Sequence, residues 1–142
     1  MNVDALLEIS LHCLMQHYHP EWGDRDGLDV FNRLLAKNPK PTDWTTNTHL
    51  TFQRSDIRSR REQWTTEALG AIPRARSDPS GVDIPCPIII AEYDGAQRVL
   101  DGNHRINRWV AADDQRIHEV HVHTVTGLPH FVVLPPLGPA TV

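Results

Sequence analysis

The run Asp101-Gly102-Asn103-His104-Arg105 places phosphate-binding residue types at a turn that begins a helix. The first backbone N–H groups of a helix have no intrahelical partners and present partial positive charge to an anion. Gly102 lets the backbone approach that anion, and Asn103, His104 and Arg105 add side-chain donors. We expect Arg105 to be exposed and to be the main ligand, because a guanidinium stays charged and matches two phosphate oxygens.

Asp101 would repel a bare phosphate, so its position beside the turn has three interpretations. It can hold a magnesium ion against the phosphate, act as the base for a hydroxyl nucleophile, or cap the helix. The first two make Asp101 a catalytic residue, with His104 beside it. The third makes Asp101 structural.

A strand, a hairpin and a helix are predicted to position this run. The segment Pro87–Ala91 is short, apolar and β-branched, which favours a buried strand. Asp94-Gly95 tolerates the positive φ of a tight hairpin, so Gln97–Leu100 is the return strand. The helix from Asn103 has apolar residues three and four apart, which predicts one buried face. These residues are Ile106, Trp109 and Val110.

Over roughly Ile84–Val125 the chain resembles the ParB N-terminal/sulfiredoxin superfamily. The resemblance lies in the Pro-Ile-Ile-Ile strand, the hairpin, the Asp-Gly-Asn-His-Arg turn and a later strand. In that superfamily a Gly-x-x-Arg turn binds nucleotide phosphates, which implies this role for Gly102 and Arg105.

The residues between that glycine and arginine separate the branches of the superfamily. Sulfiredoxins have their catalytic cysteine where this chain has Asn103, and ParB partition proteins have Glu there and Arg at the position of His104. The free-serine-kinase type, with Asp-Gly-His-His-Arg, is the most similar in motif. It implies ATP and magnesium rather than CTP switching or sulfinic-acid reduction.

The predicted fold class is α+β, a small ParB/sulfiredoxin-like domain with a mixed or mainly antiparallel sheet flanked by helices. Residues 1–142 form a single domain, with 1–40 as a helical N-terminal extension and 84–134 as the core. The extension contains an antiparallel helical pair, predicted from apolar periodicity. Its helices span about 4–18 and 26–37. The sheet strands are expected near 86–92, 97–100, 118–125 and 131–134, with a weaker strand at 49–52.

A polar helix is predicted from Asp56 to about Leu69, with Ser55 as its cap. The one concentration of basic residues in this acidic chain lies in or near it: Arg54, Arg58, Arg60 and Arg61, with Arg74 and Arg76 following. One interpretation is a solvated face balanced by nearby acids. The other is a surface that contacts nucleic acid through Arg54, Arg58 and Arg61.

Histidines and cysteines give two further expectations. His121 and His123 share one face of a strand, with His118 nearby in sequence, so they could bind a transition metal with Asp101; an exposed strand face is the alternative. Cys13 and Cys86 are the two cysteines. They are predicted to be separate buried thiols rather than a disulfide.

Composition limits the functional classes. The 142 residues have a net charge of −4 and 39% hydrophobic residues, which is ordinary for a soluble domain and argues against unspecific coating of nucleic acid. No apolar run is long enough for a membrane partner, and no signal peptide is evident, so a cytoplasmic location is expected.

The sequence therefore predicts binding of ATP or another nucleoside triphosphate, with magnesium, at Gly102–Arg105. Phosphoryl transfer or hydrolysis would make the protein a kinase-like or NTPase-like enzyme. One alternative is a ParB-related DNA-binding regulator or nuclease. Another is a non-catalytic interaction module of a mobile element or toxin system.

Overall fold

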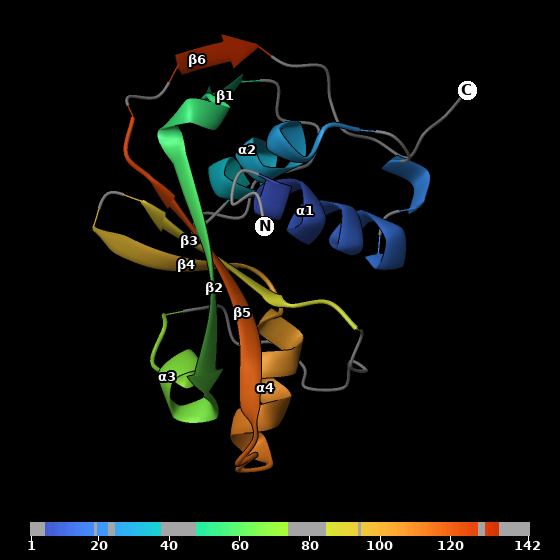
Figure 1. The fold of residues 1–142 in the computed structure, drawn as a ribbon, viewed down its shortest axis with the longest axis vertical. Coiled ribbons are helices and arrows are strands. Elements are labelled where there is room, and N and C mark those ends of the chain that lie inside the picture. Colours follow the sequence, from blue (N-terminus) through green and yellow to red (C-terminus); the bar gives the residue numbers. More distant parts are fainter. Residues whose placement is uncertain are drawn as a thin grey trace.

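A four-stranded mixed sheet forms the centre of the molecule, in the order β2–β5–β3–β4 (Figure 1). The structure is a computed structural model and describes residues 5–18, 20–22, 25–37, 48–73, 85–93, 95–127 and 130–133. The strands of this sheet are β2 (Ile57–Thr65), β3 (Ile88–Tyr93), β4 (Ala96–Asp101) and β5 (Ile117–Val125). The fold class predicted from the sequence, α+β with a mixed sheet, is confirmed.

Helices lie on both sides of this sheet. They are α1 (Ala5–Tyr18), α2 (Gly27–Lys37), α3 (Thr66–Gly70) and α4 (Asn103–Ala111), with short 3-10 turns η1 (Pro20–Trp22) and η2 (Arg54–Asp56). In Figure 1, α1 and α2 lie in the upper half of the view, and α3 and α4 in the lower half. None of the described helices has the length and apolar composition needed to cross a bilayer.

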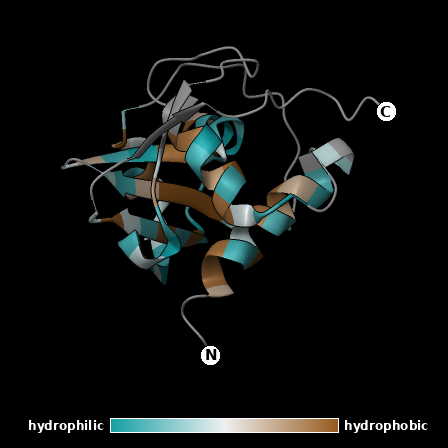
Figure 2. Cartoon of the chain, turned by 90° about the horizontal axis from the view of Figure 1, so that it is seen from above, coloured by the Kyte–Doolittle hydropathy of each residue, from teal (hydrophilic) through white to brown (hydrophobic). Residues whose placement is uncertain are grey.

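The interior position of β3 in the sheet explains why residues 88–91 form a continuous apolar run. β3 pairs in parallel with β5 and antiparallel with β4, and β5 also pairs antiparallel with β2. Because β3 is inside the sheet and helices cover both faces, Ile88, Ile89, Ile90 and Ala91 are all buried. Figure 2 shows hydrophobic residues concentrated along the strands and on the helices packed against them. The predicted strand, hairpin and helix are confirmed, and Gly95 has a φ of 73° in the hairpin, whereas Asp94 lies outside the described residues. The predicted buried face of the helix is right for Ile106 and Trp109 but wrong for Val110, which is 45% exposed.

Each face of the sheet has its own hydrophobic core. Ile89 and Leu100 face α1 and α2, where they join residues such as Leu11 and Phe31. Ile88, Ile90, Val120 and Val122 face α3 and α4 and pack against Ile106 and Trp109. Side chains on a strand alternate between faces, so each strand contributes to both cores.

The predicted helical pair is confirmed, and α1 is joined to α2 through Glu8. The backbone N–H of Gly27 donates to Glu8 Oε2 at 3.0 Å, and that of Leu28 to Asp26 Oδ1 at 3.0 Å. These bonds satisfy the first N–H groups of α2, which a helix cannot satisfy internally. The start of α2 is therefore fixed on α1.

Two predictions about the remaining elements are wrong. Residues 56–69 are not one helix: Ile57–Thr65 is the strand β2, and only Thr66–Gly70 is helical, capped by Thr65 Oγ1 on the Ala68 N–H at 3.1 Å. Pairing with β5 along nine residue pairs overrides the local preference. The last strand, β6 (His130–Val133), pairs with β1 (Thr48–Thr51) in a separate two-stranded sheet rather than joining the main one.

Candidate functional site

The predicted phosphate-binding turn is the junction between β4 and α4. Gly102 is the residue before the helix, with a φ of 111° that favours glycine, and the first helical bond runs from the Ile106 N–H to the Gly102 carbonyl at 2.9 Å. Gly102 is buried, and a Cβ built on it would overlap the Cδ1 atom of Ile88. Both the backbone conformation and the packing therefore require glycine here.

Arg105 is buried, contrary to the expectation of an exposed side chain. Only 2% of the residue is accessible. Its Nη1 donates to the Cys86 carbonyl at 2.6 Å, and its Nη2 to Asp101 Oδ2 at 3.2 Å. Burial of this guanidinium is offset by the Asp101 carboxylate, which balances its charge, and by the Cys86 carbonyl, which accepts from one of its N–H groups. Its Nε is buried and has no hydrogen-bond partner among the described residues.

The other residues of the turn differ in accessibility. The side chain of Asp101 is 11% accessible, Asn103 is half-buried and His104 is exposed. The first turn of α4 contains no acidic residue, and Gly102 has no side chain with which to cap it. The junction thus combines a helix start, an exposed imidazole and an arginine held by a carboxylate.

His121 and His123 form a buried polar chain instead of an exposed strand face or a metal site with Asp101. His121 Nδ1 lies 2.6 Å from Ser10 Oγ, and His123 Nε2 lies 3.2 Å from the same oxygen. His123 Nδ1 lies 2.7 Å from Ser59 Oγ. Burial under α1 makes the protonated form unfavourable and lowers the pKa of His123 to about 3. The pKa of His121 is also lowered by burial, against the opposing effect of Glu119.

His118 is on the opposite face of β5 from that chain. Its ring stacks on Trp109 at a centroid distance of 3.7 Å, and its Nε2 lies 2.9 Å from Thr66 Oγ1. Burial lowers the pKa of His118. The structure therefore separates His118 from His121 and His123.

The arginines considered for nucleic-acid contact do not form one surface. Arg54 donates to Glu8 of α1 and lies 3.4 Å from Oδ1 of Asp26, the residue before α2, so these two acids hold it. Arg58 and Arg61 are exposed on the edge strand β2. They are opposite Thr124 and His121 in the register with β5, which places them on opposite faces of the sheet.

Cys13 and Cys86 form a disulfide, so the expectation of two separate thiols is wrong. The bond joins α1 to the segment before β3, and the two Cα atoms are 5.8 Å apart. Folding brings together residues that are 73 positions apart in the chain. His17, one turn after Cys13 on α1, lies beside the pair, and the ligand atoms of the three residues are within 4.8 Å of one another.

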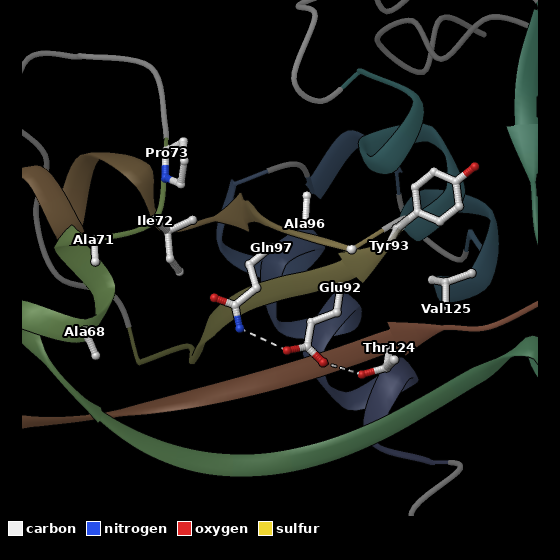
Figure 3. Close-up of a pocket in the computed structure, with 11 residues that line it drawn as sticks. Ala68, Ala71, Ile72, Pro73, Glu92, Tyr93, Ala96, Gln97, Thr124 and Val125 are labelled. Carbon is white, nitrogen blue, oxygen red and sulfur yellow. Dashed lines mark hydrogen bonds between the residues drawn. The ribbon is translucent and has the colours of Figure 1, made fainter.

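A pocket of about 690 Å³ at the hairpin end of the sheet was not anticipated from the sequence (Figure 3). Its floor is polar: Glu92 accepts hydrogen bonds from Thr124, Gln97 and Arg60. These donors, chiefly Arg60, lower the pKa of Glu92 to about 2. The sequence contained one signal for this pocket. Glu92 and Thr124 follow, in the same alternation, the buried apolar side chains of β3 and β5 that face α3 and α4, but both are polar.

Comparison of the chain with protein-family models, with curated proteins and with solved structures found no match. The resemblance to the ParB/sulfiredoxin superfamily therefore stays a prediction from the five-residue turn and the order of elements around it. The fold agrees with a small α+β domain.

Proposed function

We propose that the chain binds the phosphate groups of a nucleoside triphosphate, with magnesium, at the start of α4. The observation that carries the proposal is the position of Arg105 at that helix start, where a carboxylate is already its partner. The oxygens of Asp101 are the same type of acceptor as phosphate oxygens. Arg105 is therefore suited to oxyanions, and its position needs no rearrangement of the backbone.

The backbone and the side chains of the turn would make different contributions to phosphate binding. The first turn of α4 favours an anion through its dipole, and no acidic side chain within that turn opposes it. His104 is exposed beside the same turn and supplies a further donor. Phosphate would share or replace the contact that Arg105 now makes with Asp101.

Magnesium would reconcile Asp101 with a phosphate at this position. Two anionic groups at one helix start repel each other, and a divalent cation between their oxygens removes that repulsion. Magnesium binds proteins through one or two carboxylates together with substrate phosphates, which fits the single carboxylate of this turn. With the cation bound, the site would neutralise charge in phosphoryl transfer, and Asp101 would orient the attacking group.

The proposal is tested by thermal unfolding of the whole chain with ATP, CTP and pyrophosphate, each with and without magnesium. A ligand at 100 times its dissociation constant adds about 2.7 kcal/mol to the free energy of unfolding. We expect magnesium with a triphosphate to raise the melting temperature of the natural chain. No stabilisation by any of these ligands contradicts phosphate binding.

Two arginine variants locate the site. Arg105→Lys keeps a positive charge but loses the planar fork, so the ligand-induced shift should be largely lost. Arg116→Lys is the matched control, since Arg116 is 63% exposed beyond the other end of α4 and pairs with Asp114. An equal loss of the shift in both variants would place binding elsewhere. Circular dichroism of each variant shows whether it is folded.

A further inference from the structure

The pair Cys13–Cys86 and the imidazole of His17 form a cluster outside the phosphate-binding turn. Among the described residues, they are the group of Cys, His, Asp and Glu side chains whose ligand atoms are close enough to share a metal ion. Two of the three come from one helix: Cys13 and His17 are four positions apart on α1, so they project from the same face. Cys86 reaches them from the segment before β3.

The donor set identifies the metal. Two cysteine sulfurs and one imidazole nitrogen are ligands that zinc prefers, whereas magnesium and calcium prefer oxygen. We propose that the reduced form of this protein binds one zinc ion through Cys13, His17 and Cys86. Three protein ligands leave one of four tetrahedral positions open. Because His17 is exposed, water or a small anion can occupy that position.

Binding depends on the oxidation state of the sulfurs. In the disulfide, both sulfur atoms are bonded to each other, and neither is the thiolate that coordinates zinc. A dithiol reductant supplies two electrons and two protons, breaks the S–S bond, leaves two thiols and is itself oxidised to a disulfide. Zinc then displaces the two thiol protons as it binds. In the disulfide the Cα atoms of Cys13 and Cys86 are 5.8 Å apart, so the two sulfurs lie close together without movement of α1.

The position of Cys86 gives the metal site a connection to the rest of the fold. The Cys86 carbonyl accepts the hydrogen bond from Arg105 Nη1, so the chain segment that carries the sulfur also positions the arginine. The zinc inference does not depend on phosphate binding by Arg105. It depends on the three ligand residues alone.

The experiment titrates the whole chain with cobalt(II), whose absorption reports tetrahedral coordination and sulfur ligation, and then with zinc as a competitor. The reduced natural chain should bind one equivalent of cobalt with thiolate-to-metal absorption, and zinc should displace it. The oxidised natural chain should bind none. Binding by the oxidised chain equal to that by the reduced chain overturns the proposal, as does a reduced chain without thiolate-to-metal absorption.

His17→Asn and His12→Asn form a matched pair that does not disturb the cysteines. Both histidines are exposed on α1, but His12 lies towards Glu8, with Nε2 3.5 Å from Oε2. Loss of a group that hydrogen-bonds to a metal ligand typically weakens metal affinity roughly 10- to 100-fold. Loss of a ligand itself should weaken zinc binding by at least as much, and we expect this result in His17→Asn. His12→Asn should bind as the natural chain does. An unchanged affinity in reduced His17→Asn removes the imidazole from the site and refutes the three-ligand proposal.

Discussion

Asp101 Oδ2 lies 3.2 Å from Arg105 Nη2, so the two charged residues of the predicted phosphate-binding turn are partners of each other. Gly102 stands between them in the chain and turns β4 into α4. The pair is mostly buried, with side-chain exposures of 11% for Asp101 and 3% for Arg105. A residue expected to act only on a ligand thus also holds the junction together.

The first prediction follows from that pair. Arg105→Ala removes the buried guanidinium that donates to the Asp101 carboxylate and the Cys86 carbonyl, so it should lower the free energy of unfolding by about 3 kcal/mol. Urea unfolding followed by circular dichroism measures the loss. The control is Arg116→Ala, whose side chain is 63% exposed and should contribute little. A loss in Arg105→Ala no larger than in this control would show that the buried contacts do not stabilise the fold.

The second prediction concerns Gly102. Alanine there adds the strain of a positive φ and a clash with Ile88, so Gly102→Ala should cost about 2–5 kcal/mol. Gly95→Ala is the matched control, because Gly95 also has a positive φ but a Cβ there would meet nothing within 4 Å. It should cost only about 1 kcal/mol. Equal losses in the two variants would mean that packing against Ile88 is unimportant.

A second-site change tests the same clash directly. Ile88→Val removes the Cδ1 atom that a Cβ at Gly102 would meet. In the double variant the loss should therefore be smaller than the sum of the two single losses, which a double-mutant cycle detects. Simple additivity would contradict direct contact between the two positions.

The third prediction is a pH dependence from the buried histidines. The pKa of His123 falls from 6.5 to about 3 on burial, so the unfolded chain binds a proton that the folded chain does not. The part of the free energy of unfolding that depends on a neutral His123 is fully present above pH 6.5 and is lost as the pH falls towards about 3. Between about pH 5 and 6.5, the free energy of unfolding should rise with pH by up to about 1.4 kcal/mol per unit for this residue.

The groups around His123 also affect the pH dependence of the free energy of unfolding. His121, with its own lowered pKa and its contact to Glu119, titrates in the same direction, while Ser10 and Ser59 are uncharged. His123→Gln should reduce the slope without abolishing it. An unaltered slope in His123→Gln would show that the ring is protonated equally in both states.

The fourth prediction concerns the disulfide, with a chelator present to exclude metals. Cross-linking residues 73 positions apart restricts the unfolded chain, and the loop-entropy model gives about 4 kcal/mol for that length. Reduction should therefore lower the urea concentration at the midpoint of unfolding. The dependence of the free energy of unfolding on urea concentration reports the greater expansion of the reduced unfolded chain. Cys13→Ser in the absence of reductant should reproduce the effect. A midpoint that does not respond to reductant would contradict it.

Elements with strong local patterns were predictable from the sequence. The helices α1, α2 and α4 have apolar residues three and four apart, and the β3–β4 hairpin contains a run of β-branched residues and a glycine turn. These signals operate within a few residues. They gave the fold class and brought Asp101 and Arg105 to one turn.

The missed features depend on partners distant in the chain. β2 is polar along most of its length and becomes a strand because β5 offers it a complete ladder. His121 and His123 are buried because α1 and α2 cover that face, and neither residue type nor alternation indicates which face a helix will cover. The disulfide and the pairing of β6 with β1 also join distant segments, which local periodicity cannot specify.

The separation of β2 and β5 along the chain has a consequence for synthesis on the ribosome. Residues paired between β2 and β5 are 52 to 68 positions apart, so β2 leaves the ribosome well before the strand that will complete it. During that interval its backbone N–H and C=O groups are open to pairing with any other chain. Charged side chains on such a strand oppose pairing with other chains. Those of β2 are Arg58, Arg60, Arg61 and Glu62. The charges that made β2 resemble an exposed helix thus protect the nascent chain from aggregation.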